Sequence, residues 1–274
     1  MSIIDIPDRD LSKAMTLLSI ERMSVFKSIA GDERHAILLH HQMLSTAAAL
    51  MPVIAIIEIC LRNEVCEQMS ALLGNADWLQ NPPLQFAWRD QERGAIAKAV
   101  NHARRTSYAK KSHHEKKYLD NFAYPNGLPQ NLNHRDRVKA RQRVIQITIG
   151  QLIAQLTLAF WKRLFSTDYE DALWERKLKR VFPNKSISRS KISENLEIIY
   201  QTRNRIAHHE PLYGPRLEAA LKSIDFIAAA FAAKSEGTPT LLEAMIKHHR
   251  ENLQTESDSL SDLLATFNVS DSSK

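Results

Sequence analysis

The chain has 274 residues, of which 44% are hydrophobic and 25% charged, an ordinary globular composition with a formal net charge of +6. Only seven glycines and few alternating apolar and polar runs argue against a sheet and for an all-helical protein. Cys60 and Cys66 fall six positions apart in one predicted helix and cannot bridge each other, so we expect core thiols of a reducing compartment. The mild basic excess suits a polyanionic partner, or serves solubility alone.

The N-terminus has no basic region that leads into an apolar stretch, so we expect no secretory signal and a cytoplasmic protein. One run, Met43–Leu61, approaches the length of a membrane span. Glu58 inside the run, Pro52 near its middle and Arg62 just after it favour a buried core helix instead. We therefore expect no membrane partner.

Apolar spacing predicts a first helix over residues 11–29 that Gly31 stops. Asp32 then caps a long second helix from about Arg34 to Leu73, kinked at Pro52. A loop over residues 74–83 follows.

The most basic stretch runs from Arg89 to Lys117, where nine Lys and Arg minus three Asp and Glu leave a local charge of +6. Turn-forming residues at 124–129 mark an ordered loop or the edge of a basic insertion over about 86–135. Such a charge run is either a solvated face or the place where an RNA backbone lies. The RNA-binding candidates are Arg104, Arg105, Lys110, Lys111, Lys116 and Lys117.

The pattern next predicts a third long helix over about Asp136–Phe165 and a shorter helix over Asp168–Val181, which ends at Pro183. An aromatic group recurs there at helical spacing inside apolar runs, which favours core packing over base stacking. Its members are Phe160, Trp161, Phe165, Tyr169 and Trp174.

A polar connection at 186–190 and a polar motif near residue 205 precede the C-terminal part of the chain. An Ala-rich helix is expected over Leu217–Ala233, a break over 234–239 and another helix over about Leu241–Leu253. We expect one helical domain over residues 1–254. The Ser- and Asp-rich tail at 255–274 is either a loosely docked helix or partly disordered.

The polar motif is the run Arg203-Asn204-Arg205-Ile-Ala-His208-His209-Glu210-Pro211, at the end of an apolar-periodic segment. Pro211 disfavours helical geometry at the preceding residue, so the helix should end near His208 or His209. Residues four apart share a helix face, which pairs Asn204 with His208 and Arg205 with His209. Arg203 and His208 lie roughly 140° apart around the axis, so they converge only if the helix loosens or if two subunits contribute.

These groups suit cleavage of an RNA phosphodiester by the neighbouring 2′-hydroxyl. His moves protons at neutral pH, and Arg offers a planar cation to the charge that builds on the phosphoryl oxygens. Basic residues and His are also ordinary in a last helical turn, where they cap carbonyls and complement the helix dipole. Adjacent His residues point about 100° apart on a helix, so we expect neither metal nor cofactor.

The motif resembles the RNxxAHHxP signature of the Abi-like (abortive infection) proteins, where it forms the Arg-x4–6-His motif of the HEPN superfamily. Two other stretches are similar to segments of that family. One is Leu50–Glu64, and the other runs from Leu158 to Pro183, except that Thr157-Leu158-Ala159 stands where many relatives have Ser-Phe-Gly. The resemblance spans about residues 20–221 and implies an all-α HEPN-type helical bundle with long helices and helical insertions.

That resemblance implies a metal-independent endoribonuclease that acts in anti-phage abortive infection or as a toxin-like growth inhibitor. Arg203 would bind phosphate, His208 would be the general acid or base and Asn204 would orient one of them. Arg205 and His209 are secondary candidates. Glu58 and Arg62, one helical turn apart, would brace the core or the site, with Asn63 beside them.

HEPN nucleases usually bring two motifs together, so the resemblance also implies a homodimer in which two Arg203–His208 sets face each other. An antitoxin or a phage-derived trigger would restrain or release cleavage. Two alternatives stay open: a protein that binds RNA or a nucleotide without cleaving it, and an interaction module whose polar motif ties the bundle together.

Overall fold

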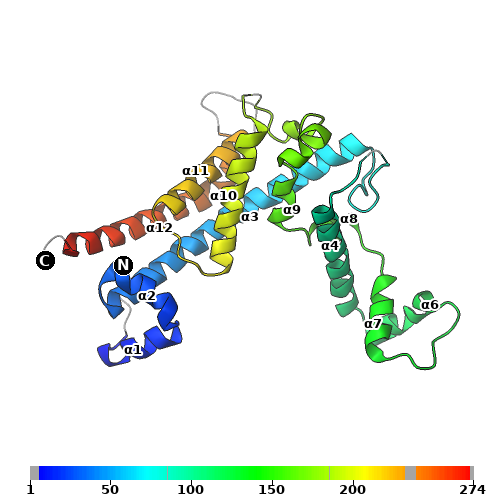
Figure 1. Ribbon diagram of the computed structural model, residues 1–274, viewed down its shortest axis with the longest axis horizontal. Helices are drawn as coiled ribbons and strands as arrows, with labels where there is room; N and C mark the ends of the chain where they lie inside the picture. The colour runs from blue at the N-terminus through cyan, green and yellow to red at the C-terminus, as the bar shows by residue number, and fades with distance from the viewer. Residues whose placement is uncertain (1–5, 85, 185, 232–238, 272–274) are drawn as a thin grey trace. The chain divides into compact units, whose positions relative to one another are not determined.

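The computed structural model describes residues 6–84, 86–184, 186–231 and 239–271, and within those ranges it contains helices and turns but no strand. The all-α prediction is confirmed. The chain divides into two compact units, one formed by Met1–Cys60 with Phe182–Lys274 and the other by Leu61–Val181. We call them the first and the second unit. The long helix α3 (Glu33–Leu73) crosses the boundary in sequence between them (Figure 1).

The first unit contains the start of α3 and five other helices, with α10 packed on α11, α11 on α12 and α12 on α2 (Figure 1). Polar side chains also tie α3 to α12, because Gln42 donates to the Glu256 carboxylate at 2.8 Å and Thr46 donates to the Glu256 carbonyl at 3.2 Å. The other helices are α1 (Asp8–Leu17), α2 (Ile20–Ala30), α10 (Arg189–Ala207), α11 (Pro215–Ala230) and α12 (Leu241–Asp271).

The single helix predicted over residues 11–29 is wrong, because the chain breaks between α1 and α2. Ser19 adopts a positive φ of 75° there, and the nearby Leu17 and Ile20 are 79% and 65% exposed. No packing therefore favours a continuous helix at this turn. The predicted stop at Gly31 and the cap at Asp32 are confirmed, since Asp32 Oδ1 accepts a hydrogen bond from the His35 amide at 2.9 Å.

The helix predicted over Leu241–Leu253 continues to Asp271, so the tail is helical over 255–271. Leu260 and Leu263 are buried and hold this end of α12 against the first unit. Of the two possibilities for the tail, the docked helix is the one observed. The predicted break at 234–239 falls almost wholly, and residues 272–274 fall entirely, outside the described residues.

The second unit replaces the long helix predicted over Asp136–Phe165 by three short ones. Five β-branched residues between Val144 and Ile149 lose side-chain freedom in a helix, and Thr148 instead forms a capping box with Gln151 that starts α8. The helix predicted over Asp168–Val181 is also wrong, because three short turns stand there. The elements are α4 (Asp90–Ala109), α5 (His113–Tyr118), α6 (Asp120–Ala123), α7 (His134–Arg143), α8 (Ile149–Ile153), α9 (Leu158–Arg163), η1 (Thr167–Tyr169), η2 (Glu170–Trp174) and η3 (Leu178–Arg180).

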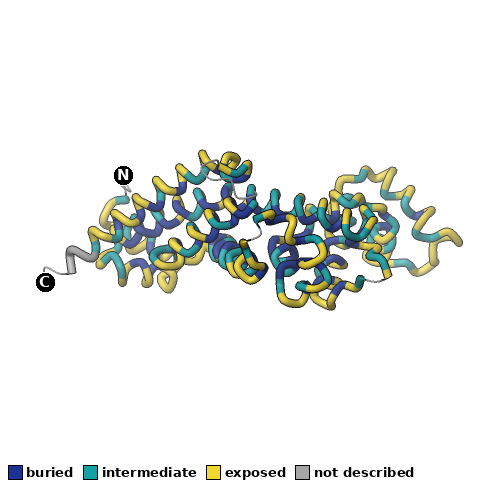
Figure 2. Tube along the Cα trace, turned by 90° about the horizontal axis from the view of Figure 1, so that it is seen from above, coloured by how far each residue is buried: buried dark blue, intermediate teal, exposed yellow. Residues whose placement is uncertain are grey.

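The five aromatic residues from Phe160 to Trp174 are all buried, which confirms their assignment to the core, and Figure 2 shows the buried stretches along the chain. A buried carboxylate lies among them. Glu92 is 1% exposed and accepts hydrogen bonds from Arg163 Nε and from the Tyr169 hydroxyl, both at 2.7 Å. Burial, and then the bond to Glu92, raise the pKa of Tyr169, so the hydroxyl keeps its proton and donates.

A second buried carboxylate joins α6 to α7. Asp120 is 7% exposed and accepts two hydrogen bonds from Arg141, at 2.6 Å each, and two from Arg137. Hydrogen bonds from these two guanidinium groups hold the pKa of Asp120 well below its usual range.

Both cysteines are free thiols and half-buried. Burial raises the pKa of Cys60 and raises that of Cys66 to about 12, so neither is a ready nucleophile at neutral pH. By length and composition α3 is the one described helix able to cross a membrane, and 33% of its most apolar window is buried.

Replacing Asp120 with Asn should lower the free energy of unfolding by about 3 kcal/mol at pH 7, because two guanidinium groups lose a buried ionic partner. The folded-state pKa of Asp120 is depressed, so its contribution is present above the unfolded-state pKa of about 4 and is lost as the pH falls below it. Urea denaturation at pH 7 and at pH 3 measures both effects. The control is Asp171→Asn at an exposed position, and an equal loss in both variants would contradict a stabilising role of the Asp120 ion pairs with Arg137 and Arg141.

Candidate functional site

The polar motif lies at the C-terminal end of α10, as the sequence predicts. Ser188 caps the start of this helix by accepting a hydrogen bond from the Lys191 amide at 3.3 Å. The helix ends at Ala207 with His208 as its C-cap, which confirms the predicted end. Its buried stripe faces the core of the first unit and consists of Ile192, Leu196, Ile199, Thr202 and Ile206.

Two backbone hydrogen bonds close this end of the helix. The His209 amide donates to the Ile206 carbonyl at 3.0 Å, and the Glu210 amide donates to the Arg205 carbonyl at 2.9 Å. This is the Schellman arrangement, in which the residue after the C-cap is left-handed and is usually glycine. His209 occupies that position with a φ of 54°. A side chain there costs about 1–2 kcal/mol, so the chain carries an imidazole where stability favours glycine.

The side chains of the motif separate into two groups. Arg205 makes an ion pair with Glu210 at 2.9 Å and so reinforces the turn. Helical spacing predicts His209 as its neighbour instead. Arg203 and Asn204 are half-buried and His208 is exposed, and none of these three side chains hydrogen-bonds to another described residue. The guanidinium of Arg203 therefore keeps its donors for a ligand.

The three support candidates lie on α3 across the boundary between the units. Glu58 belongs to the first unit and is half-buried, whereas Arg62 and Asn63 belong to the second. Arg62 is half-buried with a buried Nε that has no hydrogen-bond partner among the described residues, and Asn63 is exposed. Their role in the site stays a prediction.

The six RNA-binding candidates lie in the second unit on α4, on α5 and between them. Three have intramolecular partners: Arg104 Nε donates to the Ile145 carbonyl at 3.3 Å, Lys111 lies 3.5 Å from the Glu115 carboxylate, and the Lys116 ammonium lies 5.1 Å from the centre of the Tyr108 ring. The other three, Arg105, Lys110 and Lys117, are exposed.

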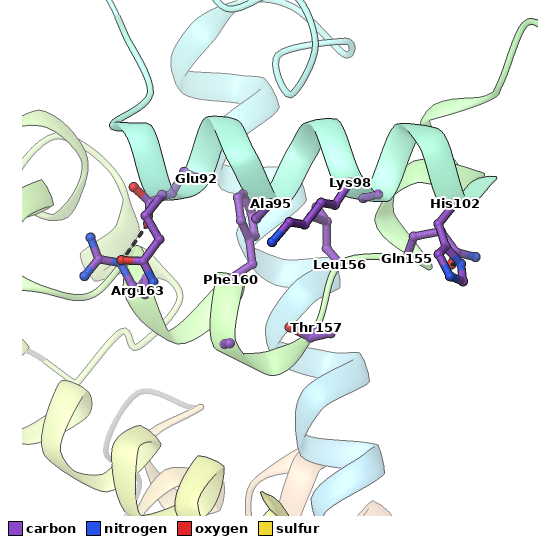
Figure 3. Close-up of a pocket in the computed structure, with 12 residues that line it drawn as sticks. Glu92, Ala95, Lys98, His102, Gln155, Leu156, Thr157, Phe160 and Arg163 are labelled. Carbon is purple, nitrogen blue, oxygen red and sulfur yellow. Dashed lines mark hydrogen bonds and ion pairs between the residues drawn. The ribbon is translucent and has the colours of Figure 1, made fainter. Parts of the chain in front are cut away.

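The second unit also has a groove of about 450 Å³ between α4 and α9, which sequence reasoning missed. Figure 3 shows Lys98 extending over the groove, with His102 and Gln155 at one end and the Glu92–Arg163 ion pair at the other. His102 and Gln155 hydrogen-bond to each other at 3.0 Å. The polar groups at both ends are thus engaged, and the floor is apolar.

A smaller cavity of about 250 Å³ lies in the first unit, directly beside the motif. His209, Glu210 and Pro211 form one wall, and α2 and α3 supply the others. His40 also lines it, although the sequence placed this residue only in the polar start of the long helix that begins near Arg34. The described residues contain no group of three His, Cys, Asp or Glu side chains able to hold a metal ion.

Fold and site define an all-helical protein in which an Arg–His motif ends a core helix and leaves the Arg203 guanidinium without a hydrogen-bond partner among the described residues. The family model of the Abi-like proteins matches residues 44–214, which include most of α3, the second unit and the whole motif. The chain belongs to this family. No curated protein and no solved structure gives a significant match.

Replacing His209 with Gly should raise the free energy of unfolding by about 1 kcal/mol, because glycine adopts a left-handed φ without steric cost. Thermal melts of the wild type and the variant measure the change. The control His208→Gly places glycine at a position whose φ of −98° gives it no such advantage. Equal shifts for the two variants would show that the turn stores no strain at His209.

Proposed function

We propose that this protein is a metal-independent endoribonuclease of the HEPN type and that it acts in abortive infection. The family to which the chain belongs suggests the defence role. The nuclease proposal rests mainly on Arg203, whose half-buried guanidinium has no partner among the described residues. It lies in the last turns of a helix that ends in the exposed His208. A cation and an imidazole so placed suit a phosphodiester.

In the proposed reaction the 2′-oxygen of a ribose attacks the neighbouring phosphorus while the bond from phosphorus to the 5′-oxygen breaks. His208 takes the proton from the 2′-hydroxyl or supplies one to the leaving 5′-oxygen. Arg203 stabilises the charge on the phosphoryl oxygens, and Asn204 orients the phosphate or the imidazole. The products are a 2′,3′-cyclic phosphate and a 5′-hydroxyl.

A second copy of the chain completes this site in our proposal. Arg203 and His208 do not bond to each other, and one His208 does not both remove and supply a proton at the same moment. The first unit also exposes an apolar stripe along α3, where Leu44, Met51 and Ile59 are 40%, 37% and 43% exposed at helical spacing. Leu44 lines the cavity beside the motif, so a dimer across this stripe would bring two motifs close together.

The RNA backbone would lie on the exposed cations of α4 and α5, and the protein would work in the cytoplasm, where RNA is abundant. An antitoxin or a phage-derived trigger would set when cleavage begins. Contacts between these cations and RNA phosphates carry no sequence information, so they would raise the affinity for RNA without selecting a sequence.

Wild-type protein should cleave a mixed cellular RNA pool in the presence of EDTA and leave cyclic-phosphate ends. Arg203→Ala and His208→Ala should each lose at least about a hundredfold in rate, because charge stabilisation and proton transfer each contribute on that order. Arg176→Ala and His248→Ala, both at exposed positions, serve as matched controls. Melting curves and dimer content are measured for every variant.

Each alternative function has its own outcome in this experiment. RNA binding without cleavage would show that the protein binds RNA and is not a nuclease. A drop in melting temperature for Arg203→Ala that accounts for all lost activity would favour the interaction module. Cleavage that EDTA abolishes would overturn the metal-independent mechanism.

Sedimentation equilibrium should show a dimer that Met51→Arg dissociates, because the substitution places a charge in the apolar stripe of α3. Glu67→Arg, at an exposed position of the same helix in the second unit, should leave the dimer intact. Dissociation should also abolish cleavage. A wild type that stays monomeric at high concentration and still cleaves RNA would contradict the shared site.

A further inference from the structure

His40 is a buried imidazole that hydrogen-bonds to no described residue. It lies on α3 with 5% of its surface exposed, and its Nδ1 is fully buried without a hydrogen bond. Its other ring nitrogen makes no hydrogen bond with a described residue either. A buried polar group left unsatisfied costs about 1–3 kcal/mol, so such groups point to an occupant that the protein alone does not supply.

The same imidazole lines the 250 Å³ cavity beside the motif. Water occupies about 30 Å³ in the liquid, and pockets for complete drug-sized ligands begin near 300 Å³. The cavity is thus larger than a site for one or two waters and suits a single ring system. It meets the end of the motif helix through Ile206 and the strained His209.

The walls of the cavity are mainly apolar. The Phe26 ring meets the His40 ring edge to face, with 5.1 Å between the ring centres. Two other polar residues line the walls, His209 and Glu210, and Glu210 is already paired with Arg205. A phosphate would lose its hydration against such walls and face a carboxylate, whereas a flat heterocycle would bury its faces and leave one edge for His40. The apolar lining consists of Phe26, Met43, Leu44, Ala47, Ala48, Ile206 and Pro211.

His40 has the protonation state that base recognition needs. Burial lowers its pKa, and the charges of His41 on α3, Arg22 on α2 and His209 after α10 lower it further. A neutral imidazole offers one donor and one acceptor, which matches the edge of a nucleobase. Proteins that read RNA place unstacked bases in such pockets and hydrogen-bond their edges.

We infer that this cavity, lined by His40, Phe26 and His209, binds one nucleobase of the RNA beside the phosphate held by Arg203. The inference rests on the proposed function for the identity of the ligand and adds the group that selects the cleavage position. His40 is a specificity residue in this role. It hydrogen-bonds the base and takes no part in proton transfer to the reacting atoms.

The test uses full-length protein and six-residue 2′-O-methyl oligonucleotides of A, C, G or U, which lack the attacking hydroxyl and cannot be cleaved. Calorimetry measures their affinity for the wild type, His40→Leu, Ala47→Leu and the control His41→Leu. His40→Leu removes the hydrogen bond, Ala47→Leu fills the cavity, and His41 is exposed and does not line it. His40→Leu should fold well, because it replaces an unsatisfied polar group by an apolar one of similar size.

We expect one base type to bind the wild type at least tenfold more tightly than the other three. His40→Leu and Ala47→Leu should lose that preference, and His41→Leu should keep it. Equal binding of all four oligonucleotides, or a preference that both cavity variants retain, would overturn the inference. If His40→Leu fails to fold, Ala47→Leu decides the result.

Mapping of cleavage sites on natural RNA separates this inference from the proposed function. A wild type that cuts nothing but shows the His40-dependent preference would refute the nuclease and keep the base site. A wild type that cuts at the same positions as His40→Leu would keep the nuclease and refute the base site.

Discussion

The chain reversal at the end of α10 determines which polar side chains of the motif have a partner within the protein. Its two backbone hydrogen bonds, from His209 and Glu210 to carbonyls of the preceding turn, stop the helix and turn the chain back. Glu210 thereby reaches Arg205, and His209 lines the cavity. Arg203 and His208 remain without partners among the described residues. A short polar run thus divides into groups that hold the turn and groups that no described residue binds.

The basic composition of the second unit overstates the number of its cations that are free of a carboxylate partner. Arg137 and Arg141 form ion pairs with Asp120, and Arg163 forms one with Glu92. A buried carboxylate is stable only when cations and hydrogen bonds surround it. Others pair on the surface, such as Lys111 with Glu115. The exposed cations that remain without an ion pair among the described residues include Arg105, Lys110 and Lys117 at α4 and α5 and also Arg135, Lys139 and Arg143 on α7, so they are fewer than a count along the sequence indicates.

The sequence predicts the long elements well and the short ones poorly. α3 and α10 carry long apolar stripes with Asp32 and Ser188 as caps, so local rules and packing agree. Between residues 136 and 181 local capping, as at Thr148, competes with apolar periodicity, and short helices and turns result. In the candidate site, the motif helix and its end were predictable. The burial of His40 was not, because three separate segments of the chain create it.

The family match includes the proposed catalytic residues and leaves out the residue proposed to select a base. The match runs from residue 44 to residue 214, so it includes Arg203, His208 and the cavity wall formed by Ile206 and His209. Phe26 and His40 precede it. Membership of the family therefore accounts for the motif, while three of the ten residues that line the cavity, Phe26, His40 and Met43, precede the matched range. Groups that perform a reaction must be shared by the proteins that carry it out, but groups that choose among substrates need not be. His40 lies outside the matched range, in keeping with the selective role that we propose for it.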